Sequence, residues 1–172
     1  MLLCWLMKSF FIEKKIHYTG KTSCISWAKS HFDLEGDVVL ASVGTSPRPK
    51  KTKKLASVSS RQPMLHLWVE HSALTQREAL FCQSLLAGIV ADTLRGGFFR
   101  SGAELYYDQA RLSQSEFTYE EGRAELYLGL CIQSTEPFMI GLDDFDIPAR
   151  ELSFSVLQQY CEDIHRIQGA LL

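Results

Sequence analysis

The sequence predicts a single domain of the α+β class, and three observations support this. The chain has 172 residues, which is room for one hydrophobic core and not for two. Hydrophobic residues make up 46% and charged residues 22%, as in an ordinary globular protein. The expected strands are clustered along the chain rather than alternating with helices, which favours an α+β over an α/β arrangement.

The first part of the chain predicts three strands and a short helix. Residues 8–18 mix apolar and charged residues and end at a turn, which indicates a strand. Residues 22–33 carry apolar residues near helical spacing and predict a short helix. Residues 38–43 are an apolar run between glycines and predict a buried strand. Residues 64–71 predict a further strand, on which alternate side chains point to opposite faces.

A long helix is expected directly after residue 75. Thr75 and Glu78 form a capping box, in which each side chain satisfies a backbone amide of the first turn. Gly96 and Gly97 are residues that commonly end a helix. The apolar stripe between these limits recurs at 3.6-residue spacing and consists of Cys82, Leu85, Leu86, Ile89, Val90 and Thr93.

The following segment predicts β-structure over residues 103–108, 110–119 and 124–133. Residues 120–122 supply a turn, so the last two segments are expected to pair as a hairpin. The short apolar run 138–140 predicts one more strand.

A last helix is expected from about Pro148, with Asp146 as its N-cap. Asp143 and Asp144 precede Asp146, and three carboxylates in four residues could bind a cation. The spacing of a calcium loop is missing, so capping by Asp146 together with solvated loop charge is the preferred interpretation. The apolar face of the helix is expected from Leu157, Tyr160, Cys161, Ile164 and Ile167.

Charge is distributed unevenly along the chain. Residues 1–61 hold 11 basic and 4 acidic residues, a balance of +7, whereas residues 62–172 hold 7 and 16, a balance of −9. A uniformly basic nucleic-acid binder is therefore not indicated. Six of the basic residues lie between Arg48 and Arg61, and residues 45–62 are expected to form a basic flexible loop. The alternative is a basic arm that contacts a phosphate or an acidic partner.

The cysteines and the apolar runs indicate a cytoplasmic protein. The five cysteines are odd in number, widely spaced and without a C-x-x-C pair, which is typical of reduced thiols. No apolar run approaches the roughly 18 residues that a membrane span needs, so we expect no membrane partner. Residues 1–7 are oily but lack a basic segment ahead of them, and we interpret them as an N-terminal extension not native to the domain.

Four stretches in a fixed order resemble one known family. They are Tyr18-Thr19-Gly20, the run 36–40, the strand 64–71 and the strands between Leu105 and Cys131. Together they resemble the domain-of-unknown-function 366 family of uncharacterised prokaryotic proteins, over about residues 8–170. This resemblance implies a mixed, mostly antiparallel sheet flanked by helices, similar to the catalytic domain of biotin and lipoate protein ligases and so class II synthetase-like. It implies no activity, because the family has none assigned.

The ligase resemblance can be followed residue by residue. Where biotin-type ligases carry Pro-Asn-Asp-Leu, this chain has residues 102–105, with Ala103 at the Asn position and Glu104 at the acidic position. The ligase lysine corresponds to Arg111, since no lysine follows Lys54. Lysine is a compact point charge and arginine a planar fork, so the exchange is not conservative.

These comparisons lead to a predicted ligand pocket lined by Arg100, Glu104, Arg111 and His66, which would bind a small anionic or nucleotide-like ligand. For the arginines the alternative is salt bridging to nearby carboxylates. A second hypothesis places acyl or adenylyl transfer at the same four residues. A third is a non-catalytic interaction protein that uses the basic loop 48–61. No cofactor and no oligomeric state is indicated.

His66, Glu70 and His71 form the densest group of possible metal ligands. On a strand His66 and Glu70 share a face and His71 points away, so a metal would need a third ligand from elsewhere. The preferred interpretation is that Glu70 orients His66 in a polar patch under the capped helix, and we assign no metal.

Overall fold

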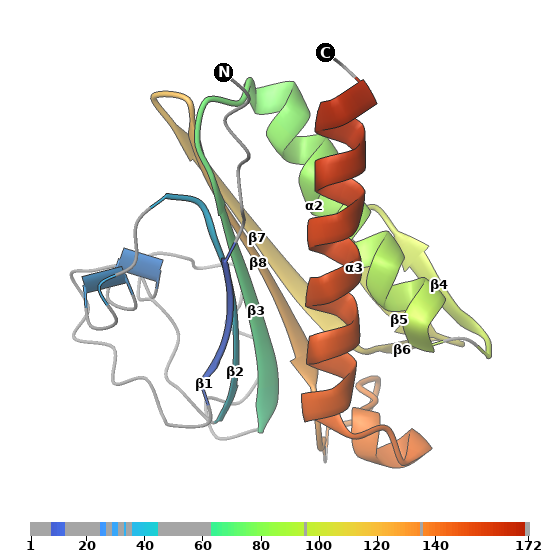
Figure 1. The fold of residues 1–172 in the computed structure, drawn as a ribbon. Helices are drawn as coiled ribbons and strands as arrows, with labels where there is room; N and C mark the ends of the chain where they lie inside the picture. The colour runs from blue at the N-terminus through green and yellow to red at the C-terminus, as the bar shows by residue number, and fades with distance from the viewer. Residues whose placement is uncertain are drawn as a thin grey trace.

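The computed structural model describes residues 8–12, 25–26, 29–30, 33, 36–44, 63–94, 96–134 and 136–170 (Figure 1). The predicted extension 1–7 and the predicted basic loop 45–62 lie outside these residues. Of the expected strand 8–18, the described part is β1 (Lys8–Ile12), and of the expected helix 22–33 the described pairs 25–26 and 29–30 are helical.

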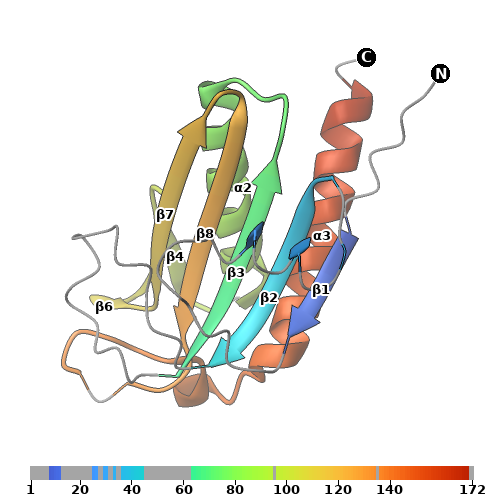
Figure 2. The same cartoon turned by 90° about the vertical axis from the view of Figure 1, so that its left-hand side faces the viewer.

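A five-stranded sheet, sheet A, forms the centre of the fold (Figure 2). Its strand order is β1, β2, β3, β8, β7, with β1 parallel to β2 and the other neighbours antiparallel. The prediction of a mixed, mostly antiparallel sheet is therefore confirmed. Beyond β1, the bounds are β2 (Val38–Gly44), β3 (Met64–His71), β7 (Ser113–Glu120) and β8 (Arg123–Cys131).

The long helices α2 (Gln76–Leu94) and α3 (Ala149–Ala170) both cover the same face of sheet A (Figure 1). Side chains of a strand alternate between faces, so Leu65, Leu67 and Val69 of β3 meet the helices and are fully buried. Burial of each such side chain stabilises the fold by about 1.5–3 kcal/mol. We call this the helix face, and the opposite face of sheet A the far face, which is turned toward the viewer in Figure 2.

The start of α2 agrees with the sequence. The Thr75 hydroxyl accepts a hydrogen bond from the Glu78 amide at 3.2 Å, and Glu78 Oε2 accepts from the Thr75 amide at 2.7 Å. The predicted capping box is thus confirmed. Gly96 and Gly97 follow the helix with φ of 65° and 96°, a backbone conformation that favours glycine.

Sheet B is a small three-stranded sheet beside α2, made of β4 (Phe98–Ser101), β5 (Glu104–Tyr107) and β6 (Ala110–Arg111). Strand β4 was not predicted, because its four residues follow a helix stop and are largely exposed. The expected strand 110–119 divides at Leu112, since β6 pairs with β5 whereas β7 pairs with β8. The expected strand 138–140 is reduced to a single bridge between Arg111 and Met139.

The prediction that Asp146 caps the last helix is wrong. A 3₁₀ helix, η2 (Leu142–Phe145), comes first, and Asp146 ends it in the left-handed conformation with φ of 53°. Helix α3 begins one turn later, where the Leu152 amide donates to the Pro148 carbonyl at 3.0 Å. Asp144 Oδ2 instead accepts from the Gly141 amide at 2.8 Å and caps η2. In the part of the chain that the structure describes, no helix is both long and apolar enough to cross a membrane.

Candidate functional site

Four neighbouring strands place one row of residues across the far face. Ser42 of β2 pairs with His66 of β3, which pairs with Gly129 of β8, which pairs with Gln114 of β7. Three strand spacings make this row about 14 Å long. Ser42, His66 and Gln114 are only 2%, 6% and 1% exposed. Polar side chains are thus buried here. On β2, β3 and β8 the neighbouring residues on the helix face are aliphatic, whereas β7 also buries Ser113 on that face.

Tyr127 joins this polar row from the next position of β8. Its hydroxyl oxygen lies 2.8 Å from Nδ1 of His66, and the His66 ring stacks on Trp68 with centroids 5.1 Å apart. Gly129 provides the space for the phenol, because a Cβ at this position would lie 2.2 Å from the Tyr127 hydroxyl oxygen. The absence of a side chain at Gly129 therefore allows the hydrogen bond between His66 and Tyr127.

Gln114 differs from the other members of the row. Its Nε2 is buried, and it is the only buried side-chain nitrogen or oxygen among the described residues without a hydrogen-bond partner. A buried amide without a partner costs free energy, so such groups are rare unless water or a ligand satisfies them. The row therefore contains a donor directed at no described acceptor.

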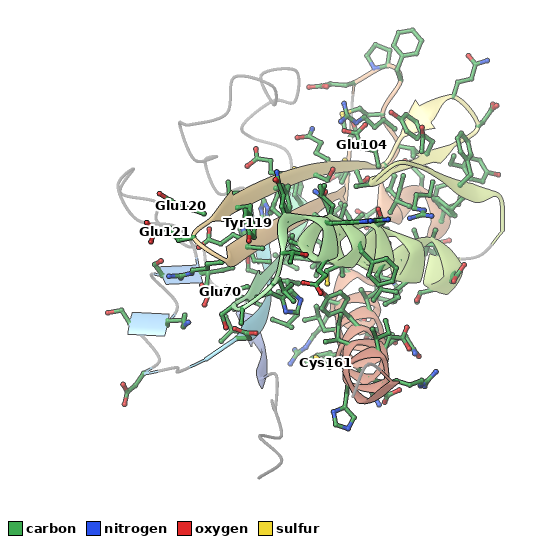
Figure 3. The ribbon with its side chains drawn as sticks, turned by 90° about the horizontal axis from the view of Figure 1, so that it is seen from above. Glu70, Glu104, Tyr119, Glu120, Glu121 and Cys161 are labelled. Atoms are coloured by element: carbon green, nitrogen blue, oxygen red, sulfur yellow. The ribbon has the colours of Figure 1, made fainter. Side chains whose placement is uncertain are left out.

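A charged cluster lies further along the far face, at Glu70. Lys29 Nζ contacts Glu70 Oε1 at 2.5 Å, and the guanidinium of Arg123 donates to Glu70 Oε2. Glu70 is buried and lies near the β7–β8 turn that carries Glu120 and Glu121 (Figure 3). Two cations neutralise this carboxylate, which explains how its charge is tolerated away from water.

His71 belongs to the helix face and to a different network. Its Nε2 lies 2.6 Å from the hydroxyl of Tyr160 on α3, and its Nδ1 lies 3.7 Å from Oδ2 of Asp37. Burial opposes the charged form of the imidazole, but the facing Asp37 carboxylate and the neighbouring Cys82 outweigh it and raise the pKa of His71 to about 9. Burial would also raise the pKa of Asp37, yet hydrogen bonds from His71 and Ser72 lower it.

The three predicted metal candidates are therefore placed apart. His66 and Glu70 share the far face, as expected, but lie in separate clusters, and His71 lies on the helix face. The described residues contain no group of three His, Cys, Asp or Glu side chains that could hold a metal ion. The prediction that His66 and Glu70 form a polar patch under the capped helix is wrong, because both side chains point away from α2.

Of the predicted pocket, the structure brings two residues together. Arg111 forms an ion pair with Glu104, and its Nε donates to the Ser113 carbonyl at 2.8 Å. Arg100 pairs with Leu105 in the register of sheet B and so lies on the opposite side from Glu104; its Nη1 donates to the Ser84 carbonyl of α2 at 2.9 Å. His66 belongs to sheet A. The salt bridge between Arg111 and Glu104 is the alternative that the sequence offered for these charges.

Cysteine chemistry gives no second site in the described residues. Cys82 and Cys131 are buried, and Cys161 is half-buried on α3 (Figure 3). Burial raises the pKa of Cys131 to about 11 and that of Cys161 above its ordinary value, which keeps both thiols protonated and poorly nucleophilic. Cys24 lies outside the described residues.

Sequence reasoning missed Gln114, Tyr127 and Gly129. The alternation of β8 did contain a signal, since Glu125, Tyr127 and Gly129 share one face of a predicted strand. A glycine inside a strand often marks a close approach by another group. The missing information was the register, which alone shows that Gly129 lies between His66 and Gln114.

Biotin protein ligases have this fold. The biotin acetyl coenzyme A carboxylase synthetase of Helicobacter pylori, solved with bound biotinylated ATP, superposes with a TM-score of 0.60 at 11% identity, over 91% of this chain and 74% of that one. The Aquifex aeolicus biotin protein ligase, solved in complex with biotin and ATP, gives 0.59 at 11% identity, over 90% and 68%.

The family follows from a more specific match. Residues 7–172 match the domain of unknown function DUF366, and the chain belongs to that family. A protein of unknown function from Pyrococcus horikoshi superposes with a TM-score of 0.79 at 21% identity, over 96% of each chain. No curated protein matches the sequence. The resemblance to this family that the sequence suggested is thereby confirmed.

Proposed function

We propose that this protein binds a small anionic or nucleotide-like ligand on the far face of sheet A, at the polar row that contains His66. The observation that carries the proposal is the burial of Ser42, His66 and Gln114 in one row beside Tyr127. Packing alone would favour apolar residues on a buried sheet face, because buried polar groups contribute little net stability. A ligand that hydrogen-bonds to the row gives these residues a role.

Two further features support a flat or charged ligand. The rings of His66, Trp68 and Tyr127 lie within 6 Å of one another and offer aromatic surface to a planar group. Arg111 is the last residue of β6 and lies three residues before Gln114 along the chain. Its side chain is 30% exposed despite the ion pair with Glu104. A guanidinium with five N–H groups can bind a carboxylate or phosphate while it keeps one carboxylate partner.

We therefore keep His66, Glu104 and Arg111 in the proposed site, with Glu104 orienting the guanidinium. Arg100 is left out of the direct contacts, because its Nη1 is engaged by α2 on the other side of sheet B. The fold supports the proposal by analogy only: two of the similar structures hold biotin with ATP, or biotinylated ATP, and fold does not determine function.

Thermal-shift and calorimetric titrations test the proposal. The purified protein is titrated with AMP, ATP, biotin and octanoate, and we expect at least one of these to raise the melting temperature. The shift is expected to fall in His66→Gln and to persist in His165→Gln, a matched change at an exposed histidine of α3. No shift with any of the four probes would contradict ligand binding. A shift equal in both variants would contradict the location.

Acyl or adenylyl transfer is a second candidate, favoured by the ligase-like fold and by the cation at Arg111. Such an enzyme stabilises charge on the carboxylate and phosphate oxygens during transfer. It would catalyse exchange of labelled pyrophosphate into ATP in the presence of a carboxylic acid. We expect this exchange to require Arg111, so that Arg111→Gln abolishes it. Binding without exchange across a panel of acids would restrict the protein to the first proposal.

A further inference from the structure

We propose that Gln114 is a specificity-determining residue, whose side-chain amide donates a hydrogen bond to an uncharged acceptor on a planar head group of the bound ligand. This inference rests on the proposed function and narrows its ligand class. It concerns the end of the polar row that lies on β7, the edge strand of sheet A.

Gln114 carries an unpaired hydrogen-bond donor. Gln114 is 1% exposed, and its Nε2 has no hydrogen-bond partner among the described residues. Methionine has nearly the same length and shape and would fill the same space without a polar atom to satisfy. A glutamine at this position therefore lowers the stability of the ligand-free protein unless another group accepts from it.

The chemistry of the donor limits what the ligand can present to Gln114. An amide nitrogen donates and does not accept, so its partner must carry a lone pair, as a carbonyl oxygen or a ring nitrogen does. Gln114 is neutral, whereas the cationic groups near the site, such as Arg111, suit the charged part of a ligand. Because Arg111 takes the charged part of the ligand in this proposal, the acceptor assigned to the Gln114 amide is uncharged.

Aromatic rings lie beside Gln114 along the row. Gly129 separates Gln114 from His66 in the row, and the phenol of Tyr127 lies above it. A ligand that reaches Gln114 thus lies next to aromatic rings, which favour a flat group. A planar ring with a carbonyl or ring-nitrogen acceptor satisfies both conditions, and a flexible aliphatic chain satisfies neither.

The test compares two glutamines that differ in their partners. Gln83 Nε2 donates to the Glu116 carbonyl at 3.1 Å, so Gln83→Met removes a satisfied amide and Gln114→Met an unsatisfied one. In the ligand-free protein we expect Gln114→Met to raise the melting temperature by about 2–4 °C and Gln83→Met to lower it. A lower melting temperature for Gln114→Met would overturn the inference, because the amide would then already have a partner.

The second arm measures binding with named probes. AMP and biotin carry planar rings with acceptors, and octanoate carries a carboxylate with no ring. We expect Gln114→Met to weaken AMP or biotin binding at least tenfold and to leave octanoate binding within twofold. Unchanged ring-probe affinity overturns the inference while the proposed function stands, and so does an equal loss for octanoate. If none of the probes binds the wild-type protein, both fall.

Discussion

The Nε2 atom of His71 lies 2.6 Å from the hydroxyl oxygen of Tyr160, so one hydrogen bond joins the central strand β3 to the C-terminal helix α3. Both side chains are almost fully buried. Asp37, ahead of β2, faces the other nitrogen of the same imidazole and is itself held by the amide and hydroxyl of Ser72. The network thus connects β3 and the residue ahead of β2 to a helix that is distant in sequence.

Removing the hydroxyl of Tyr160 tests this connection. In Tyr160→Phe the Nε2 atom of the buried His71 loses the hydroxyl that contacts it, and the free energy of unfolding should fall by about 1–3 kcal/mol. Urea denaturation followed by circular dichroism measures the change. Tyr107→Phe is the control, since Tyr107 contacts Phe98 and Phe145 through its ring and its hydroxyl makes no hydrogen bond to a described residue. Equal losses in the two variants would show that the hydroxyl of Tyr160 contributes nothing specific.

The raised pKa of His71 predicts a loss of stability at alkaline pH. The pKa is about 9 in the folded protein against 6.5 for the ordinary side chain, so the folded state binds this proton more tightly than the unfolded state. The stabilisation is complete below pH 6.5 and is lost as the pH rises to about 9. It amounts to at most about 3.4 kcal/mol, at 1.36 kcal/mol for each pKa unit.

Urea midpoints measured from pH 6 to pH 9.5 check this dependence. We expect the wild-type midpoint to fall across this range and the midpoint of His71→Gln to start lower and to change less. His165→Gln, at an exposed position of α3, should follow the wild-type profile. A wild-type slope that survives in His71→Gln would assign the pH dependence to other groups.

Local signals in the sequence were sufficient to predict the helix α2, because a capping box and an apolar stripe are properties of one element. They were also sufficient to place His66 and Glu70 on one face of β3, since alternation is a property of a single strand. The prediction for Asp146 was wrong because an aspartate two residues before Pro148 matches the residue preferences of a helix N-cap, whether or not a helix starts there. Only the tertiary structure shows that a 3₁₀ helix occupies this segment and ends at Asp146.

The candidate site depended on strand register, which the sequence does not specify. Gln114 and Gly129 are 15 residues apart and look unremarkable individually, yet they pair directly across β7 and β8. The predicted association of His66 with Arg111 came from the family resemblance. It stays a prediction, because Arg111 belongs to sheet B and His66 to sheet A.

We expect a methyl group added at Gly129 to destabilise the protein, unlike a methyl group added at a glycine with open space around it. In Gly129→Ala the new Cβ would lie 2.2 Å from the Tyr127 hydroxyl and 3.0 Å from Cε of Met64, so the phenol must move away from His66. We expect a loss of about 1–3 kcal/mol in the free energy of unfolding. The loss should be smaller when Tyr127→Ala is already present, because the obstructing ring is then gone.

Gly88→Ala is the matched control for this change. Gly88 lies inside α2, and a Cβ there would meet nothing within 4 Å. Alanine is the better helix former, so this variant should be more stable by about 0.5–1 kcal/mol. If Gly129→Ala is as stable as the wild-type protein, the space above Gly129 is not occupied by Tyr127 and the geometry of the polar row is wrong.

We expect the buried Glu70 carboxylate to contribute to the free energy of unfolding at both low and high salt. Glu70→Gln leaves Lys29 and Arg123 without the carboxylate that they share, and the loss should be about 1–3 kcal/mol. This is below the 3–5 kcal/mol typical of a fully buried pair, because Arg123 is 49% exposed. Asp163→Asn on α3 is the control: its contact with Arg166 is 3.9 Å and Arg166 is 75% exposed, so this change should cost under about 0.5 kcal/mol. Urea denaturation at low and high salt compares the loss of stability in the two variants. Equal effects of the two changes, or a Glu70 effect abolished by salt, would mean that the buried carboxylate behaves as an ordinary surface charge.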